Sequence, residues 1–377
     1  PYNTDATEII YKNGYKESSW LALIASRLSL GHSLLHADGV HCLTIDDYEH
    51  AKARLLLDDE FRNDNYLATA LIRNNPSGRS TVKGFSVNHE FALFYGIEGG
   101  HTRVGRLPHT DEQRGRYDVQ GDNGAFEWEN FRKSSAGSDR ASRPKQHFPL
   151  YVQKETLAIR IPKVEWVEGT KSYEVCEAAQ KKEVIVWPVD EARTQKVWRW
   201  GIERTCSELD TLEARRVNNR IEVYGRKYLN DKGVLPRTWW DKAEYSARDN
   251  GTRVLRDMFP SDVGFDFPKA VEAVKDSIRI GCPVEDGVVL DYFGGSATTA
   301  HAVIALNRES GAQRRFVLVE MGGHFDTVLL PRIKKVTFSP EWKDGKPKRL
   351  ATPEEAERSP RIVKVVRLES YEDALNN

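Results

Sequence analysis

Apolar and polar positions alternate with two different periods along the chain, which predicts both helices and strands. Residues 18–35 carry apolar side chains at helical spacing, and residues 40–45 form a short apolar run that is typical of a strand. A second helix is expected over 47–59, and strands are expected over 66–73 and 85–95. The first helix is expected to bury Trp20, Leu23, Ile24, Leu28, Leu30, Leu34 and Leu35.

The stretch 288–320 has the pattern of a strand, a glycine turn, a helix and a second strand. Its apolar runs are 288–293 and 316–319, and residues 297–307 between them are apolar at helical spacing. In such a βαβ unit a ligand binds at the carboxyl ends of the strands, near the glycine turn and the helix N-terminus. Glu320 follows the second strand and is placed to accept hydrogen bonds from a ribose diol. The pattern therefore predicts a nucleoside-type ligand, although the Gly-x-Gly-x-x-Gly spacing of nicotinamide enzymes is absent.

The middle of the chain, residues 99–250, lacks this alternation of helices and strands and holds most of the tryptophans. Residues 131–163 are locally basic, which predicts contacts with nucleic-acid phosphates; a solvated surface is the alternative explanation of the same charges. Residues 206–229 are expected to form a charged helix followed by a strand. The residues that we select as candidate DNA contacts are Arg140, Arg143 and Lys145.

Length and composition narrow the class of protein. A chain of 377 residues predicts two domains, or one domain with a large insertion. Lys+Arg and Asp+Glu are equal at 56 each, so any nucleic-acid surface must be a local patch. Four widely spaced cysteines and no run of about 18 apolar residues predict a reduced, cytoplasmic protein without a zinc site, a disulfide framework or a membrane span.

The turn at 291–299, Asp-Tyr-Phe-Gly-Gly-Ser-Ala-Thr-Thr, resembles the S-adenosyl-L-methionine loop of the β-class DNA amino-methyltransferases. In that family the position of Ala297 is usually a second glycine. If the backbone needs a positive φ there, alanine costs about 1 kcal/mol, and if the position needs only a small residue, alanine is harmless. The resemblance implies that Phe293 packs on the cofactor adenine, that Gly295 to Thr298 line its methionine side and that Glu320 holds its ribose. The matching residues are Asp291, Phe293, Gly295, Ser296, Thr298 and Thr299.

The first four residues, Pro-Tyr-Asn-Thr, resemble the second half of the family's catalytic motif Asp-Pro-Pro-Tyr. The resemblance assigns Pro1 and Tyr2 to that motif. The missing Asp and first Pro would precede residue 1, so we expect the chain to be a fragment. The motif's carboxylate and a backbone carbonyl would accept the two hydrogens of an adenine exocyclic amine, and Tyr2 would stack on the flipped base. His89 and Glu90 either order a loop beside that base or cap a strand end.

Two further stretches carry the resemblance. Residues 264–270 are expected to open a helix with Asp266 as its cap and Pro268 in its first turn. Lys269 matches a family element beside the methionine end of the cofactor, and would bind the cofactor carboxylate. The end of the chain, 364–377, resembles a segment of type III restriction-modification Mod subunits.

The resemblance as a whole implies a Rossmann-like α/β methyltransferase in permuted order, with its catalytic half first and an inserted recognition domain. We predict a catalytic half at 1–98, a target-recognition domain at 99–250, a cofactor half at 251–340 and a C-terminal extension at 341–377. The expected reaction is methyl transfer from S-adenosyl-L-methionine to the N6 amine of adenine in double-stranded DNA, without a metal. The expected partners are a second copy of the chain and a helicase-nuclease restriction subunit.

Two alternatives remain open. One is a DNA-binding specificity module with impaired catalysis, which Ala297 and the missing Asp permit. The other is a different nucleotide-dependent α/β enzyme, such as a nicotinamide oxidoreductase.

Overall fold

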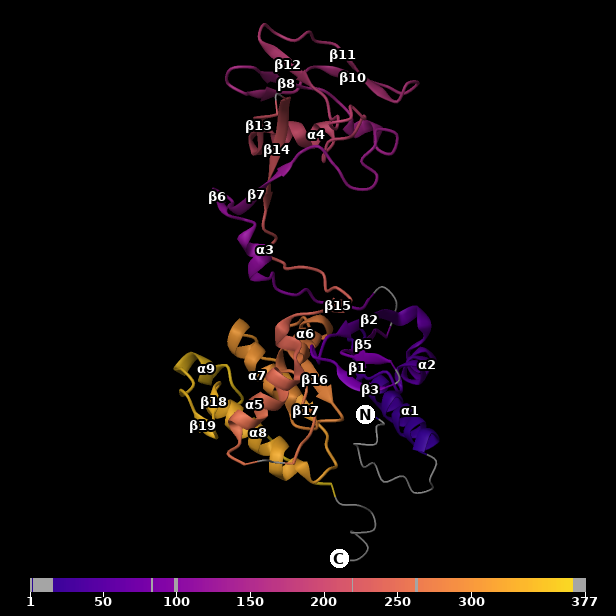
Figure 1. Ribbon diagram of the computed structural model, residues 1–377, viewed down its shortest axis with the longest axis vertical. Coiled ribbons are helices and arrows are strands. Elements are labelled where there is room, and N and C mark those ends of the chain that lie inside the picture. The colour runs from indigo at the N-terminus through magenta and orange to yellow at the C-terminus, as the bar shows by residue number, and fades with distance from the viewer. Residues whose placement is uncertain are drawn as a thin grey trace, which may run out of the picture. The chain divides into compact units, whose positions relative to one another are not determined.

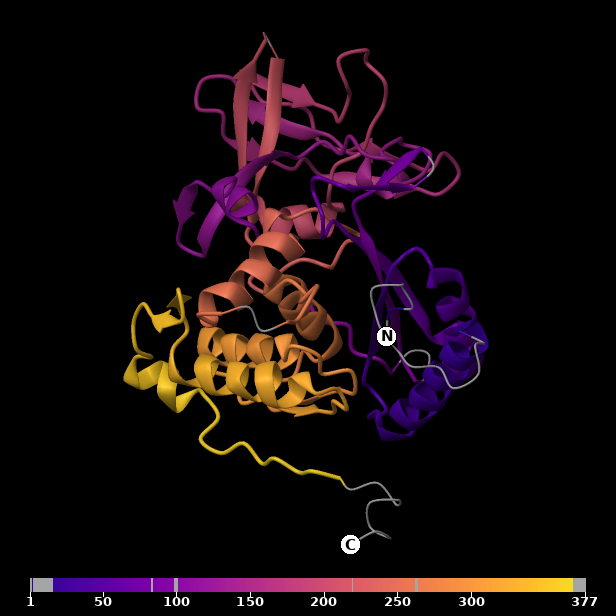
Figure 2. The ribbon, with the colours of Figure 1, turned by 60° about the horizontal axis from the view of Figure 1, so that its bottom comes forward.

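The computed structural model describes residue 2 and residues 16–82, 84–97, 101–218, 220–261 and 264–368. The chain forms two compact units, which Figures 1 and 2 show from two directions. Unit 1 combines Pro1–Pro108 with Gly233–Asn377, and unit 2 is His109–Lys232. None of the helices in the described part of the chain is long and apolar enough to span a membrane.

The first half of unit 1 is a four-stranded sheet with helices beside it (Figure 1). The strand order is β1-β5-β2-β15; β5 is antiparallel to β1 and β2, and β15 is parallel to β2. Trp240 of β15 is buried, and its ring centre lies 6.2 Å from that of Phe94. This tryptophan-containing segment therefore completes the sheet of unit 1. The elements are α1 (Lys16–Leu34), β1 (His41–Ile45), α2 (His50–Phe61), β2 (Tyr66–Ile72), β3 (Arg79–Val82), β4 (Phe85–Val87), β5 (Glu90–Tyr95) and β15 (Trp239–Trp240).

The helix α1 buries only one stripe of its apolar residues. Trp20, Ile24 and Leu28 recur every four residues and lie in the core with β1 and α2. The expectation that Leu30 and Leu34 are core residues is wrong, because these two side chains are 57% and 72% exposed. They continue the apolar composition of the helix but fall on the face away from the sheet.

The second half of unit 1 contains the predicted strand–helix–strand unit. β16 and β17 are parallel, with Val288 opposite Arg315 and Asp291 opposite Leu318. α7 joins them and contacts α6 and α8. The α/β class is therefore as predicted. The elements are α5 (Arg253–Met258), α6 (Val271–Gly281), β16 (Val288–Asp291), α7 (Thr298–Ser310), β17 (Arg315–Leu318), α8 (Leu330–Phe338), β18 (Trp342–Lys343), β19 (Lys346–Pro347) and α9 (Pro353–Glu357).

The helix expected to open at 264–270 begins later, at Val271, and Asp266 does not cap it. Its N-cap residue is Ala270, which makes no side-chain cap bond. Phe267 has φ +57°, and it precedes Pro268, a position at which the helical conformation is disfavoured. Residues 265–270 are consequently an irregular segment that carries Lys269 up to the helix.

Unit 2 has its own core of aromatic and aliphatic side chains. The rings of Phe131 and Trp198 stack in this core with their centres 5.2 Å apart, and the Trp198 indole N–H donates to the Phe148 carbonyl at 2.7 Å. Three small antiparallel sheets surround this core, in the orders β13-β14-β7-β6, β12-β8-β9 and β10-β11. The elements are α3 (Asp111–Gly115), β6 (Val119–Gly121), β7 (Gly124–Asn130), β8 (Leu150–Gln153), β9 (Ile159–Arg160), β10 (Val164–Val167), β11 (Ser172–Val175), β12 (Glu183–Val186), α4 (Ile202–Ser207), β13 (Leu212–Val217) and β14 (Arg220–Tyr228).

Two expectations about the middle of the chain differ from the structure. Unit 2 spans His109–Lys232, so residues 99–108 and 233–250 of the predicted insertion belong to unit 1. The charged helix expected from residue 206 is instead the short α4 followed by the hairpin of β13 and β14. Ala214 and Val223 pair across that hairpin and enter the core, while Glu213, Arg215 and Glu222 lie on the opposite face because side chains alternate along a strand.

Candidate active site

The turn after β16 is held in shape by its own acid, Asp291. One carboxylate oxygen accepts the Phe293 N–H at 3.0 Å, and the other accepts the Thr299 hydroxyl at 2.6 Å. Gly295 has φ +53°, a conformation that glycine adopts without steric cost. α7 then begins without a side-chain cap among the described residues, so its first N–H groups remain available to a ligand. This cradle fits the cofactor that the sequence predicts.

Ala297 has φ +61° and ψ +33°, in the left-handed region, and its side chain is fully buried. The first of the two cases considered for this position therefore applies. An L-residue with a Cβ atom pays about 1 kcal/mol in this conformation. The strain lies at the N-cap of α7, directly in the predicted cofactor loop.

Glu320 lies two residues beyond β17 and ties the turn to the following loop. Its carboxylate accepts the Gly295 N–H and the Gly322 N–H, both at 2.7 Å, and His324 Nε2 lies 3.2 Å away. Burial alone would raise the pKa of Glu320, but the two N–H groups and His324 lower it below its ordinary value. The side chain is thus a carboxylate that fastens the loop, and each oxygen keeps lone-pair capacity for a further donor.

Arg332 on α8 holds the same turn from the protein interior. It was not among the residues predicted from the sequence. Its guanidinium is fully buried and donates at 3.0 Å to the Ser296 carbonyl, the Ser296 hydroxyl and the Thr298 hydroxyl. Ser296 and Thr298, which we predicted to line the cofactor, are therefore bonded to the protein interior. The signal was present in the sequence, because Arg332 falls at helical spacing between Leu329 and the buried α8 residues Ile333 and Val336.

Tyr2 and Lys269, which are 267 positions apart, meet at the carboxylate of Glu90. Glu90 is the first residue of β5 and is only 5% exposed. Its Oε2 accepts the Tyr2 hydroxyl at 2.8 Å and the Asn74 amide at 2.9 Å, and Lys269 Nζ donates to both Glu90 and Tyr2. Burial, reinforced by the charge of Glu90, raises the pKa of Tyr2 well above its ordinary value. Tyr2 is therefore a neutral phenol in this site.

The two ends of unit 1 also share a hydrophobic core. Tyr2 and Phe293 both pack against the cluster that contains Ile45, Leu93 and Tyr95. Residue 2 at the start of the chain and residue 293 near its end therefore pack against one and the same core. Pro1, the other motif residue that we predicted, lies outside the described residues, as do residues 369–377 of the C-terminal segment.

Two of the three predicted DNA contacts line a groove on unit 2. This groove of about 530 Å³ is flanked by Arg143, Lys145 and Lys171, with one acid, Glu168. Lys145 Nζ lies 5.4 Å from the ring centre of Trp166. Arg140 is not among the lining residues; it donates to the Gln195 side chain at 2.9 Å.

The chain is similar to several known proteins. The type II methyltransferase M.KpnI of Klebsiella pneumoniae is 29% identical over 85% of this chain and 73% of its own length. The EcoPI Mod subunit of the type III enzyme from Escherichia phage P1 is 27% identical over 83% of this chain and 47% of its own length. The chain spans less than half of the type III Mod subunits that it matches. A putative DNA modification methylase of Thermus thermophilus, complexed with S-adenosyl-L-methionine, aligns over 89% of this chain and 85% of its own at 12% identity and a TM-score of 0.37.

The family model described as DNA methylase, N6_N4_Mtase, matches residues 1–325. This range includes both the motif at Tyr2 and the loop that follows β16. It confirms the predictions of a DNA methyltransferase and of S-adenosyl-L-methionine as its cofactor. The chain belongs to the DNA methylase family.

Proposed function

We propose that this protein transfers a methyl group from S-adenosyl-L-methionine to the N6 amine of adenine at a specific site in double-stranded DNA, as the modification part of a type III restriction-modification system. The observation that carries the proposal is the meeting of Tyr2 with the cofactor half of unit 1, through Lys269 and the core shared with Phe293. Relatives named EcoPI, StyLTI and EcoP15I Mod subunits support the assignment to a type III system.

The chemistry of the site supports transfer to an amine. The adenine exocyclic nitrogen is a poor nucleophile, so the protein must hold the base out of the stack and accept its hydrogens. The cofactor supplies an electrophilic methyl group on a sulfonium. Tyr2 is the ring that we assign to stacking on the flipped base, and its neutral phenol suits an apolar contact. Pro1 and the Asp-Pro that the motif requires before it would supply the hydrogen-bond acceptors.

The test is methyl transfer to duplex DNA by the protein extended with Asp-Pro before Pro1. Unmethylated phage λ DNA and labelled S-adenosyl-L-methionine are incubated with it, and the DNA is then digested to nucleosides. We expect N6-methyladenine. N4-methylcytosine would overturn the choice of base, and DNA binding without any transfer would favour the catalytically impaired specificity module. Tighter binding of NAD than of S-adenosyl-L-methionine in calorimetry would favour an oxidoreductase.

We assign the cofactor ribose to Glu320, the adenine to Phe293, and the methionine side to the turn from Gly295 to Thr298, with Asp291 holding that turn. Glu320→Ala is expected to weaken cofactor binding by about 1–3 kcal/mol, because it leaves buried N–H groups and ribose hydroxyls without an acceptor. Isothermal calorimetry measures the change in Kd. An unchanged Kd would remove the ribose role while leaving the rest of the proposal in place.

The DNA contacts and the partners are also part of the proposal. Arg143 and Lys145, with Arg140 nearby in sequence, would neutralise phosphates of the target duplex, so their loss should weaken binding equally for all sequences and flatten its salt dependence. A second copy of the chain and a helicase-nuclease restriction subunit are the proposed protein partners. Light scattering of the purified protein tests the dimer directly.

A further inference from the structure

We propose that Glu90 and Lys269 form a partly buried ion pair that positions Tyr2 for the target base, so that Lys269 serves the base side of the site rather than the cofactor carboxylate. This inference rests on the proposed function and deepens it. It differs from the role that the sequence resemblance implies for Lys269.

The contacts of Lys269 carry the first step. Its ammonium donates to the Tyr2 hydroxyl and to Glu90, and it lies 4.3 Å from the centre of the Tyr2 ring. The Lys269 side chain is 25% exposed and that of Glu90 only 6%. A lysine in this position is already compensated by a carboxylate, so it has little charge to offer an anionic ligand.

The position of Glu90 carries the second step. It begins β5 at the edge where β1 and β2 also end, since Ile45 pairs with Phe91 and Ile72 pairs with Glu90 itself. Asn74, just beyond β2, donates to the same carboxylate oxygen at 2.9 Å. The carboxylate is therefore fixed by the sheet, and it accepts one donor from the N-terminal motif and one from the segment before α6.

Together these contacts define the orientation of the Tyr2 ring. The hydroxyl is held at one end by Glu90 and Lys269, while the ring packs against the shared core. A ring clamped in this way needs no reorganisation when a base stacks on it. Loss of either charge should therefore lower the rate of methyl transfer at saturating cofactor and leave cofactor affinity almost unchanged.

Two single variants test this assignment in the extended protein. Glu90→Gln keeps the size and one acceptor but removes the charge, and Lys269→Met keeps the length of the side chain. Each is expected to reduce kcat on phage λ DNA about 10- to 100-fold, which is the range for a misplaced catalytic geometry. The Kd for S-adenosyl-L-methionine in calorimetry should change less than about twofold, since no cofactor contact is lost. A tenfold weaker cofactor affinity of Lys269→Met with an unchanged kcat would overturn the proposal and return Lys269 to the cofactor carboxylate.

The matched control is Lys275→Met. Lys275 is a buried lysine in the same part of the chain, on α6, and it pairs with Glu272 and Glu309 instead. Its loss should lower stability without the specific loss of kcat. Equal losses of kcat in Lys275→Met and Lys269→Met would mean that both act through stability alone, and would contradict the proposal.

A double-mutant cycle separates this inference from the proposed function. If the wild-type protein transfers no methyl group, the proposed function fails. The contact between Lys269 and Tyr2 can still be measured by urea unfolding of Tyr2→Phe, Lys269→Met and the double variant. We expect the double variant to shift the unfolding midpoint by less than the sum of the single shifts, because both remove the same contact. Additive shifts would show that Lys269 does not hold Tyr2, and would end the proposal even in an active enzyme.

Discussion

At the scale of single residues, the site is built from side chains that bind the protein's own backbone and from one strained alanine. Asp291 and Glu320 hold the cofactor turn through N–H groups, and Arg332 holds it from the interior. These contacts preorganise the turn before any ligand arrives, which lowers the entropic cost of binding. Ala297 works against them by about 1 kcal/mol.

The alanine leads to a stability prediction with an internal control. Ala297→Gly relieves the strain of φ +61° and loses one buried methyl group, and these effects nearly cancel at about 1 kcal/mol each. Ala300 is equally buried but lies within α7, so Ala300→Gly should cost about 1–2 kcal/mol. Urea unfolding should therefore find Ala297→Gly about 1–2 kcal/mol more stable than Ala300→Gly. Equal losses would mean that Ala297 is not strained.

Glu320 leads to a prediction about pH. Its folded-state pKa is lowered below the ordinary 4.5, so its carboxylate stabilises the fold above that pH and the stabilisation is lost as the pH falls through the folded pKa. Glu320→Gln cannot accept both N–H groups and should cost about 1–3 kcal/mol near neutrality. The difference in unfolding free energy between wild type and variant should narrow below pH 4.5. A difference that is constant from pH 7 to about 3.5 would show that Glu320 carries no such linkage.

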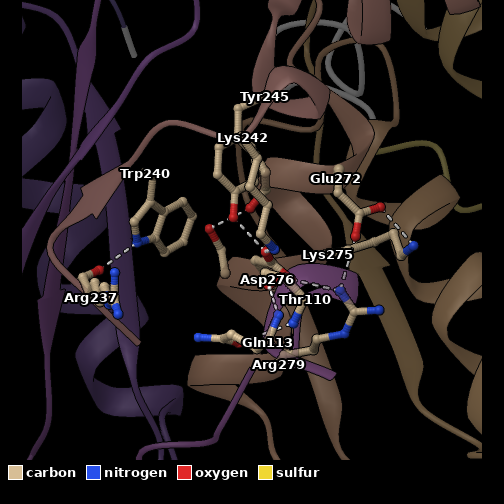
Figure 3. A network of polar contacts seen from close by, with 12 residues as sticks. Thr110, Gln113, Arg237, Trp240, Lys242, Tyr245, Glu272, Lys275, Asp276 and Arg279 are labelled. Atoms are coloured by element: carbon tan, nitrogen blue, oxygen red, sulfur yellow. Dashed lines mark hydrogen bonds and ion pairs between the residues drawn. The ribbon is translucent and has the colours of Figure 1, made fainter. Parts of the chain in front are cut away.

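At the scale of elements, α6 is the helix whose placement the site depends on, because Lys269 lies two residues before its start. Asp276 on this helix is fully buried and accepts from Lys242 at 2.8 Å, Tyr245 at 2.6 Å and Arg279 at 2.6 Å (Figure 3). Burial alone would raise the pKa of Asp276, but Lys242 and Tyr245 lower it. The network thus fastens α6 to the segment after β15 and sets where its N-terminal end lies.

Breaking this network should be costly. Asp276→Asn removes the buried carboxylate that Lys242 and Arg279 share, and is expected to lower the unfolding free energy by about 3–5 kcal/mol. The control is Asp257→Asn, which removes a more exposed ion pair: Lys343 Nζ lies 2.9 Å from the Asp257 carboxylate. Its loss should lower the unfolding free energy by less than about 1 kcal/mol. Urea denaturation monitored by tryptophan fluorescence measures both. Similar losses in the two variants would indicate that the network contributes no more than a surface pair.

At the scale of the whole molecule, the chain leaves unit 1 and returns to it at neighbouring points. Leu107 and Val234 exchange two backbone hydrogen bonds of 2.9 and 2.8 Å, so the entry and exit strands of unit 2 form a short antiparallel bridge. Loops and insertions that start and end together can be replaced with little disturbance of the remaining fold. Unit 1 contains both the contacts among Tyr2, Glu90 and Lys269 and the cofactor turn that follows β16.

The excision of unit 2 is therefore a practical experiment. With residues 109–232 replaced by Asn-Gly, which favours a tight hairpin turn, unit 1 should still fold and bind S-adenosyl-L-methionine within about threefold of the wild-type Kd. Specific binding of the target duplex should fall by about 10³ or more, to the level of non-specific binding. Calorimetry and gel-shift titrations measure the two quantities. Retained specific binding would refute the assignment of target recognition to unit 2.

Local patterns were sufficient to predict much of this protein. The spacing of apolar residues and the positions of glycines predicted the helices at Lys16–Leu34 and Thr298–Ser310 and the strands β16 and β17. Both effects act over a few neighbouring positions. The motif residues Tyr2 and Asp291 could be selected for the same reason, since their signature is contiguous. The family followed from these short stretches alone.

Tertiary structure decided the rest, because those features depend on residues that are distant along the chain. The pairing of Lys269 with Glu90 and Tyr2 spans up to 267 positions, and no local pattern distinguishes it from a contact with the cofactor. The bond from Gly295 to Glu320 and the buried donors of Arg332 depend in the same way on how α7 and α8 pack. The boundary of unit 2 depends on the pairing of Trp240 with Ile72, because a tryptophan-rich segment suits either unit until a neighbouring strand supplies its hydrogen bonds.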